Sequence, residues 1–174
     1  MSKASHIEGL FLYFFHIITM KSSLGIIGNV GVDGTADFLK KVMQELDRCK
    51  IRQIPRMIVE GVQVNRDHEK LLLENEEAEA FIKPVQNSVL RLKDAEADVI
   101  VLACNTLHVL EESIQSVLQE TRDRFLSLTH AVSEHLAEEG IQSVGIIGTA
   151  VTSAMFRQPL ENNGVKGVFP NDNI

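Results

Sequence analysis

The sequence predicts an α/β protein with parallel sheets, arranged as two similar halves of which the second is truncated. Short apolar runs alternate along the chain with helical patterns, which is typical of parallel strands joined by right-handed crossovers. One run, residues 99–103, is apolar throughout, as in a strand buried on both faces. A six-residue strand-and-turn sequence also occurs twice.

The first strand is expected at residues 24–28, which are mostly apolar. It runs into a glycine-rich turn at residues 28–34. A helix should follow and end near Cys49, because apolar side chains recur there at helical spacing. These apolar positions are Phe38, Leu39, Val42, Met43 and Leu46.

A second buried strand is expected at residues 57–59, after Pro55 interrupts the preceding pattern. Residues 60–74 are polar and are interpreted as a loop. A long acidic helix should follow at residues 75–95, and Pro84 would kink or divide it.

The third strand, residues 99–103, is followed by a helix with one apolar face. That face carries Leu107, Leu110, Ile114, Val117 and Leu118. A short fourth strand is expected at residues 125–128. Thr129 would cap the next helix, and Gly140 would end it.

A further strand is expected at residues 144–148 and a further helix at residues 150–162. Residues 23–28, Ser-Leu-Gly-Ile-Ile-Gly, recur as residues 143–148, Ser-Val-Gly-Ile-Ile-Gly, at an offset of 143 − 23 = 120 residues. Both copies open the same order of strand, turn and helix. We therefore expect two homologous, flavodoxin-like halves.

The predicted domains follow from this repeat. A first α/β domain should occupy residues 20–128, and residues 129–174 should begin a second, incomplete one. Residues 1–19 are interpreted as an apolar extension that adds little to the core. Their apolar run is too short for a membrane span and lacks the flanks of a secretory signal, and Met20 is an alternative start that would make the extension non-native.

Composition restricts the class of partner. A net charge of −7 argues against nucleic acid, which needs clustered basic side chains, and it leaves an anionic substrate to be held by local groups. No membrane association is expected. Cys49 and Cys104 have neither metal-ligand spacing nor a disulfide framework, so a cytoplasmic location is predicted.

Cys104 is the main candidate for chemistry because it stands where a buried strand ends and a helix begins. Ligands bind at this carboxyl edge in open parallel sheets. Asn105 or Thr106 would cap the helix, whose positive end favours thiolate over thiol. The alternative is that Cys104 is a small, inert core residue.

The glycine turn at residues 28–34 leaves three interpretations open. A nucleotide-binding module would use this turn together with Glu60, although Val30 stands where the central glycine of the dinucleotide motif should fall. Alternatively, the backbone N–H groups of the turn could face a small carboxylate. Tight packing of the strand against the helix needs no ligand at all.

One family is similar at these same motifs. Residues 103–108, Ala-Cys-Asn-Thr-Leu-His, closely resemble the Ala-Cys-Asn-Thr-Ala-His signature of the aspartate/glutamate racemase superfamily, in particular the aspartate racemases. Gly28, Gly31 and Thr35 match that family's Gly-Gly-Met-Gly-Pro-Glu-Ala-Thr turn, while the five residues between them differ. Residues 144–149 resemble the glycine turn of the family's second half.

The resemblance implies a racemase that uses two cysteines and no cofactor or metal. One thiolate removes the α-proton of an acidic amino acid, most simply aspartate, and a second cysteine returns a proton on the opposite face. Cys104 would be one of these bases. A homodimer and the choice between aspartate and glutamate are left open.

The resemblance also implies a set of substrate-binding residues. These are Asn105, Thr106, Arg66, Thr149, His108 and Gly31. Arg66 would hold a second carboxylate in a bidentate contact. His108 could tune the thiol or bind substrate, or it could be a satisfied structural residue.

The family's second cysteine has no counterpart in these 174 residues. It lies in a Gly-Cys-Thr-Glu motif, and the repeat places the equivalent of Cys104 at 104 + 120 = 224. Cys49 does not match that motif. The sequence therefore predicts an inactive racemase fragment, with a catalytically dead paralogue as the alternative.

Overall fold

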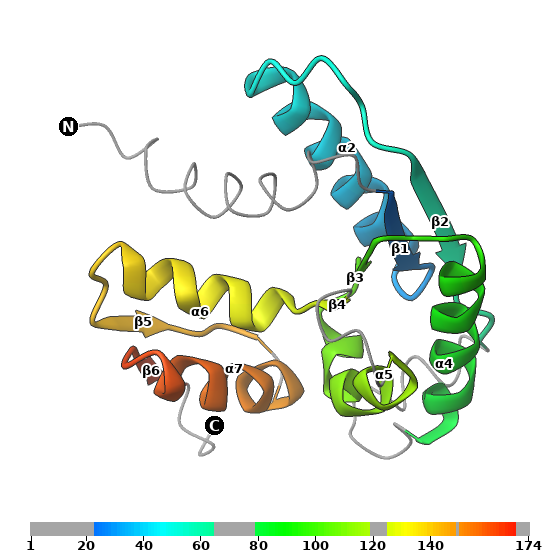
Figure 1. Ribbon diagram of the computed structural model, residues 1–174. Coiled ribbons are helices and arrows are strands. Elements are labelled where there is room, and N and C mark those ends of the chain that lie inside the picture. Colours follow the sequence, from blue (N-terminus) through cyan, green and yellow to red (C-terminus); the bar gives the residue numbers. More distant parts are fainter. Residues whose placement is uncertain (1–22, 65–78, 119–124, 149, 170–174) are drawn as a thin grey trace.

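The protein is an α/β structure with two parallel sheets, as the sequence predicts (Figure 1). The computed structural model describes residues 23–64, 79–118, 125–148 and 150–169. From residue 24 to residue 126, the elements in chain order are β1 (Leu24–Gly28), α2 (Val32–Arg48), β2 (Met57–Gly61), α4 (Glu79–Asp94), β3 (Val99–Leu102), the 3-10 helix η1 (Thr106–Leu110), α5 (Glu111–Leu118) and β4 (Phe125–Leu126). From residue 128 to residue 168, they are α6 (Leu128–Glu138), β5 (Ser143–Gly145), α7 (Ala150–Asn162) and β6 (Lys166–Val168).

The larger sheet has four parallel strands in the order β2-β1-β3-β4. This is the strand order of flavodoxin-like folds. The central strands β1 and β3 are buried along their whole length, which explains why their sequences are nearly all apolar.

Two apolar cores cover the two faces of this sheet. On one face, α2 packs Val42 and Leu46 against Leu24 and Ile26 of β1. On the other, α4, η1 and α5 cover the alternate side chains of the strands, including Ile27. Since successive strand residues point to opposite faces, each strand contributes to both cores.

A hydrogen-bonded clamp joins the amino ends of β1 and β3. The Ser23 N–H donates to the Asp98 carboxylate at 2.6 Å, and the Ser23 hydroxyl donates to the Glu96 carbonyl at 2.6 Å. The Asp98 N–H returns a bond to the Ser23 hydroxyl at 3.1 Å. These contacts fix the register of the two strands at their amino-terminal ends.

The second group of elements lies beside the larger sheet (Figure 1). α6 packs on α7, and β5 pairs with β6 in parallel. The order β5-α7-β6 therefore repeats the order β1-α2-β2, as the internal repeat predicts. The predicted boundary between domains at residues 128 and 129 stays a prediction.

Three expected boundaries are wrong. β5 ends at Gly145 instead of residue 148, and Ile147 is 96% exposed. β5 is shorter than its counterpart β1 because β1 is paired on both sides, whereas β5 has only β6 as a partner within the described chain. β4 ends at Leu126, because the Ser127 hydroxyl accepts the His130 N–H and caps α6, so the predicted cap Thr129 lies inside the helix.

Other predictions concern α4 and the undescribed segments. α4 runs unbroken through Pro84, which therefore does not divide it. The extension at residues 1–19 and the loop residues 65–74 lie outside the described residues, and so does the predicted start of the acidic helix. Within the described chain, no helix has the length and hydropathy that crossing a bilayer requires.

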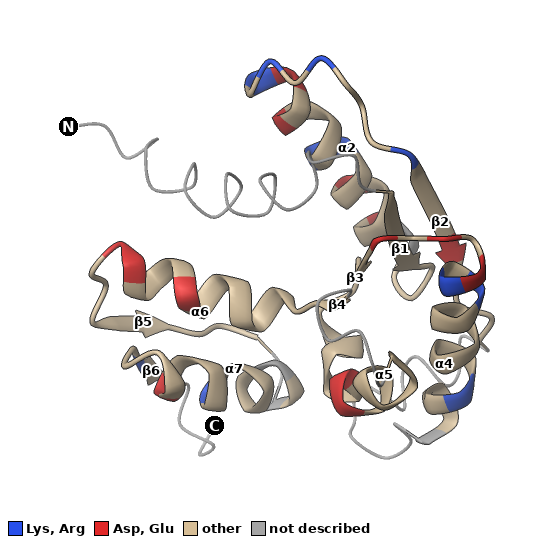
Figure 2. Cartoon of the chain, in the orientation of Figure 1, with Lys and Arg blue, Asp and Glu red and all other residues tan. Residues whose placement is uncertain are grey.

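Charged side chains of both signs are interspersed over the described elements (Figure 2). Acidic segments mark α2, α5 and α6, and basic segments stand near them on α2 and α4.

Gly25 lies where β1 approaches the end of α4 too closely for a side chain. A Cβ at this position would stand 2.9 Å from the Ala97 Cβ and 3.1 Å from a Leu92 methyl. We expect Gly25→Ala to lower the free energy of unfolding by about 1–3 kcal/mol through overpacking, measured by urea denaturation. Gly145→Ala, at the equivalent position of the repeat, meets no atom within 4 Å and should change it by less than about 0.5 kcal/mol. Equal effects of the two substitutions would contradict this packing argument.

Candidate active site

The carboxyl edge of the larger sheet contains a pocket of about 400 Å³. This volume falls in the range of ligand pockets, about 300–1,000 Å³. Its lining comes from the glycine turn, one face of α2, the end of β3 and the start of α6: Val30, Gly31, Gly34, Asp37, Phe38, Lys41, Leu102, Ala103, Cys104, Asn105 and Leu128. The structure thus brings together three residues predicted for the site, namely Gly31, Cys104 and Asn105.

Parallel pairing of β1 with β3 explains why they meet. Ile27 lies opposite Leu102, and the Ala103 N–H extends the ladder by donating to the Ile27 carbonyl at 2.8 Å. The glycine turn after β1 and Cys104 after β3 therefore leave the sheet side by side. Cys104 is half-buried, and neither it nor Cys49 forms a disulfide.

The glycine turn is shaped by its own packing. Asn29 and Gly31 both have positive φ angles, 71° and 77°, and the Asn29 N–H donates to the Thr35 hydroxyl at 3.0 Å. A Cβ on Gly28 would lie 2.5 Å from a Thr35 side-chain carbon. Val30, by contrast, is buried in the core. The match at Gly28 and Thr35 thus has a direct structural reason, the close approach of strand and helix, and the match at Gly31 has another, its positive φ angle.

The helix after Cys104 does not start as expected. Residues 106–110 form a 3-10 helix, and α5 begins only at Glu111. Asn105 is itself helical in φ and ψ, and its side chain makes no capping hydrogen bond, so its predicted role as a side-chain cap is wrong. Thr106 is the first residue of η1 and does not line the pocket.

His108 is buried behind this turn and is 4% exposed. The Leu128 N–H donates to its Nε2 at 3.2 Å, so Nε2 carries no proton and the neutral ring has its proton on Nδ1. Nδ1 lies 3.1 Å from the Cys104 carbonyl and 3.2 Å from the Asn105 carbonyl, and its N–H donates to them. Both ring nitrogens are therefore used by backbone groups, which favours the structural interpretation of His108 over substrate binding.

Burial lowers the pKa of His108, because a charged imidazole loses its hydration there. The carbonyls of Cys104 and Asn105 and the carboxylate of Glu111 act in the opposite direction and are weaker than the effect of burial. The ring is therefore neutral at pH 7, in the state that its contacts require.

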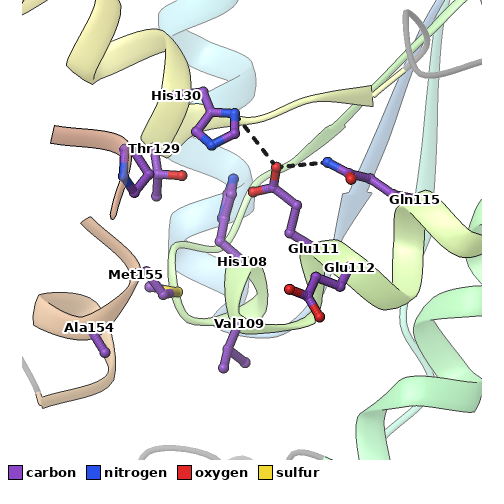
Figure 3. A pocket seen from close by; sticks show the side chains of 10 residues that line it. His108, Val109, Glu111, Glu112, Gln115, Thr129, His130, Ala154 and Met155 are labelled. Atoms are coloured by element: carbon purple, nitrogen blue, oxygen red, sulfur yellow. Dashed lines mark hydrogen bonds and ion pairs between the residues drawn. The ribbon is translucent and has the colours of Figure 1, made fainter. Parts of the chain in front are cut away.

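A second pocket, of about 440 Å³, opens on the other side of His108 (Figure 3). Its polar wall includes Glu111, whose carboxylate accepts hydrogen bonds from Ser127 at 2.7 Å and Gln115 at 3.0 Å. Figure 3 also shows His130 directed at this carboxylate, 3.9 Å from it. Part of the opposite wall comes from α7, through Ala154, Met155 and Pro159.

Four residues of the first pocket lie outside the glycine turn and the segment at the end of β3. Asp37, Phe38 and Lys41 lie on α2, and the spacing of residues 34, 37, 38 and 41 places them on one helix face. That spacing was available in the sequence. Leu128 had no such signal, because its place depends on how α6 leaves β4. Lys41 forms an ion pair with Asp37 at 2.7 Å and is the basic side chain among the described lining residues.

Other predicted residues lie elsewhere. Arg66 and Thr149 are outside the described residues. Cys49 follows α2, whose 17 residues separate it from the glycine turn by about 25 Å. The Glu60 carboxylate is held by Arg91 of α4 at 2.6 Å and does not line the pocket, which weakens the nucleotide-binding interpretation. No cluster of three or more metal-ligating side chains occurs among the described residues.

The comparisons of sequence and of structure with known proteins agree on one family. Residues 27–174 match the sequence model of the Asp/Glu/Hydantoin racemase family. Among solved structures, the chain is similar to an aspartate racemase homologue from Pyrococcus horikoshii OT3, with 28% identity and a TM-score of 0.69 over 88% of this chain and 66% of the other.

Two further structures share the fold. One is a proposed Asp/Glu racemase from Yersinia pestis, with 22% identity and a TM-score of 0.71 over 87% of this chain and 65% of the other. The other is the aspartate racemase of Picrophilus torridus, with 21% identity and a TM-score of 0.65 over 87% and 64%. The chain thus spans just under two thirds of the length of each structure.

The lowered pKa of His108 makes stability depend on pH. Below the ordinary value of 6.5 the unfolded chain gains a proton on this residue, while the folded chain does not until its lower pKa is reached. The contribution is therefore fully present above pH 6.5 and is lost as the pH falls, at up to about 1.4 kcal/mol per pH unit. We expect His108→Asn to be less stable than the parent at pH 7.5, with the difference narrowing toward pH 5. A difference that stays constant in denaturant titrations across this range would contradict the assignment.

Proposed function

The chain belongs to the Asp/Glu/hydantoin racemase family, and we propose on that basis that it supplies one half of a racemase active site for an acidic amino acid. Aspartate is the proposed substrate, and the reaction needs no pyridoxal phosphate. The observation that carries the proposal is the position of Cys104, at the end of the central strand β3 and in the wall of a pocket of about 400 Å³.

In the proposed reaction, Cys104 acts as the thiolate base for one face of the substrate. Its sulfur takes the α-proton and becomes a thiol, and the electron pair of the broken C–H bond stays on the substrate as a planar carbanion. A second thiol on the opposite face then donates its proton to the α-carbon and becomes a thiolate. Each turnover leaves the two cysteines in exchanged protonation states, so the reverse reaction begins at the other one.

Polar groups around Cys104 are suited to hold the substrate. Asn105 is exposed at the pocket and offers side-chain N–H donors, and Gly31 lines the same pocket. Lys41 could exchange its partner Asp37 for a substrate carboxylate, because this ion pair is exposed and therefore weak. Arg66 and Thr149 remain proposed substrate ligands from the family resemblance alone.

The second base is proposed to lie outside these 174 residues. The chain has two cysteines, and Cys49 is at the far end of α2. The repeat places the counterpart of Cys104 near residue 224, which suits a chain that spans 66% of its P. horikoshii relative. We therefore propose that residues 1–174 alone do not racemise aspartate.

Activity should require a chain of the relatives' full length. We expect such a chain, with a second strand-end cysteine, to racemise aspartate when followed by chiral chromatography without pyridoxal phosphate. Cys104→Ala should lower kcat by at least about 10³-fold in both directions, because it removes the base that one direction needs and the acid that the other needs. Cys49→Ala is the matched control and should retain activity. Full activity of residues 1–174 would refute the second-base assignment, and an inactive full-length chain with both cysteines would favour a dead paralogue.

The thiol of Cys104 should also be unusually reactive. In a Cys49→Ser background, we expect alkylation by iodoacetamide to proceed well below pH 8.5, the value near which ordinary cysteines ionise. Asn105→Ala should slow this alkylation if the amide N–H groups stabilise the thiolate. A rate that rises only near or above pH 8.5 would show that Cys104 is an ordinary thiol.

A further inference from the structure

We propose that His108 is a positioning residue that ties together two walls of the Cys104 pocket and releases them when its ring gains a proton. The feature behind this proposal is a bridge of three backbone groups through one buried ring. Nδ1–H donates to the carbonyls of Cys104 and Asn105, and Nε2 accepts the N–H of Leu128. Cys104, Asn105 and Leu128 all line the same pocket, whereas His108 lies behind it.

The bridge joins elements that are distant in sequence. Cys104 and Asn105 follow β3, while Leu128 is the first residue of α6, 20 residues beyond His108. The turn after Cys104 leads into η1, a short 3-10 helix without a side-chain cap, whose Leu107 and Leu110 are buried in the core. The ring thus sets the distance between the turn that carries the thiol and the start of α6.

Only one protonation state supports this arrangement. In the neutral ring with its proton on Nδ1, each nitrogen matches its partner. A proton on Nε2 would place an N–H opposite the N–H of Leu128, 3.2 Å away, and one of the two would have to move. Protonation therefore breaks the α6 side of the bridge first and leaves the Cys104 side in place.

Protons can reach His108 from the second pocket, whose wall it forms (Figure 3). Titratable groups face it there from two elements, Glu111 and Glu112 of α5 and His130 of α6. The segments contributed by α7 and β4, including Met155 and Phe125, are uncharged. Glu111 favours the charged ring and His130 opposes it, and burial outweighs both, which keeps the bridge intact at neutral pH.

The first test is spectroscopic. In ¹⁵N-labelled chain at pH 7, long-range ¹H–¹⁵N spectra should show the His108 ring with a protonated Nδ1 and a bare Nε2, the tautomer that is less populated for histidine in water. The signal is identified as the one that His108→Gln removes. A ring protonated on Nε2 alone, or on both nitrogens, would overturn the proposal.

The second test separates the two halves of the bridge. His108→Asn keeps an N–H donor at the position of Nδ1 and cannot reach Leu128, whereas His108→Gln keeps an acceptor near the position of Nε2 and loses the bond to the Cys104 carbonyl. We expect His108→Asn to lower the hydrogen-exchange protection of the Leu128 amide about tenfold, and His108→Gln to raise the alkylation rate of Cys104 by a similar factor. Ala131, whose N–H donates to the Ser127 carbonyl in the same helix, is the control amide and should be unaffected.

A third measurement needs only the parent chain, so it can be made even if a variant fails to fold. As the pH is lowered through the protonation of His108, Leu128 protection should fall relative to that of Ala131. His130→Gln is the matched control for the other histidine of the pocket and should leave this response in place. Loss of the response in His130→Gln, or equal Leu128 protection at all pH values, would overturn the proposal.

The bridge matters for catalysis only if Cys104 has the proposed role as a base. The proposal for Cys104 and the proposal for the His108 bridge can nevertheless fail separately. A full-length chain that does not racemise, with the tautomer and the exchange pattern as expected, would refute the function and leave the bridge. A chain that racemises, with Leu128 and Cys104 indifferent to His108, would refute the bridge alone.

Discussion

The parallel pairing of β1 with β3 is the constraint on which the rest of the structure depends. It places the carboxyl ends of both strands at one edge, so that the turn after Gly28 and the segment after Leu102 must share the same space. The meeting of Gly31 with Cys104 and Asn105 in the first pocket follows from this register. A shift of one residue would send the core side chains of β1 to the wrong faces, exchanging those that meet α2 with those that meet α4.

The polar groups at the start of α6 form a hydrogen-bonded network with η1 and α5. Ser127 caps the helix while donating to Glu111, and His108 takes the Leu128 N–H. Among the described residues, every buried side-chain nitrogen and oxygen has a hydrogen-bond partner. Networks that are fully satisfied in this way rigidify their surroundings, because each unmade bond would leave a buried polar group without compensation.

Much of the fold was predictable because its signals are local. Continuous apolar runs identified β1 and β3, and helical spacing identified α2. The location of Cys104 at a strand end followed from the same patterns. The strand limits of β4 and β5 were not predictable, since they depend on whether a neighbouring strand or a cap competes for the backbone. The double use of His108 was also hidden, because its partner Leu128 lies 20 residues away and contributes only a backbone group.

The clamp between Ser23 and Asp98 has a mechanical consequence for the opposite edge of the sheet. It holds β1 and β3 at their amino ends, about five residues and therefore about 16 Å from the pocket. The parallel ladder continues from there to the pocket, where the Ala103 N–H donates to the Ile27 carbonyl at 2.8 Å, so the two strands are bonded to each other at both ends. The sheet is thus a stiff floor for the pocket, and any change in the width of the pocket has to come from the turns and helices that follow the strands.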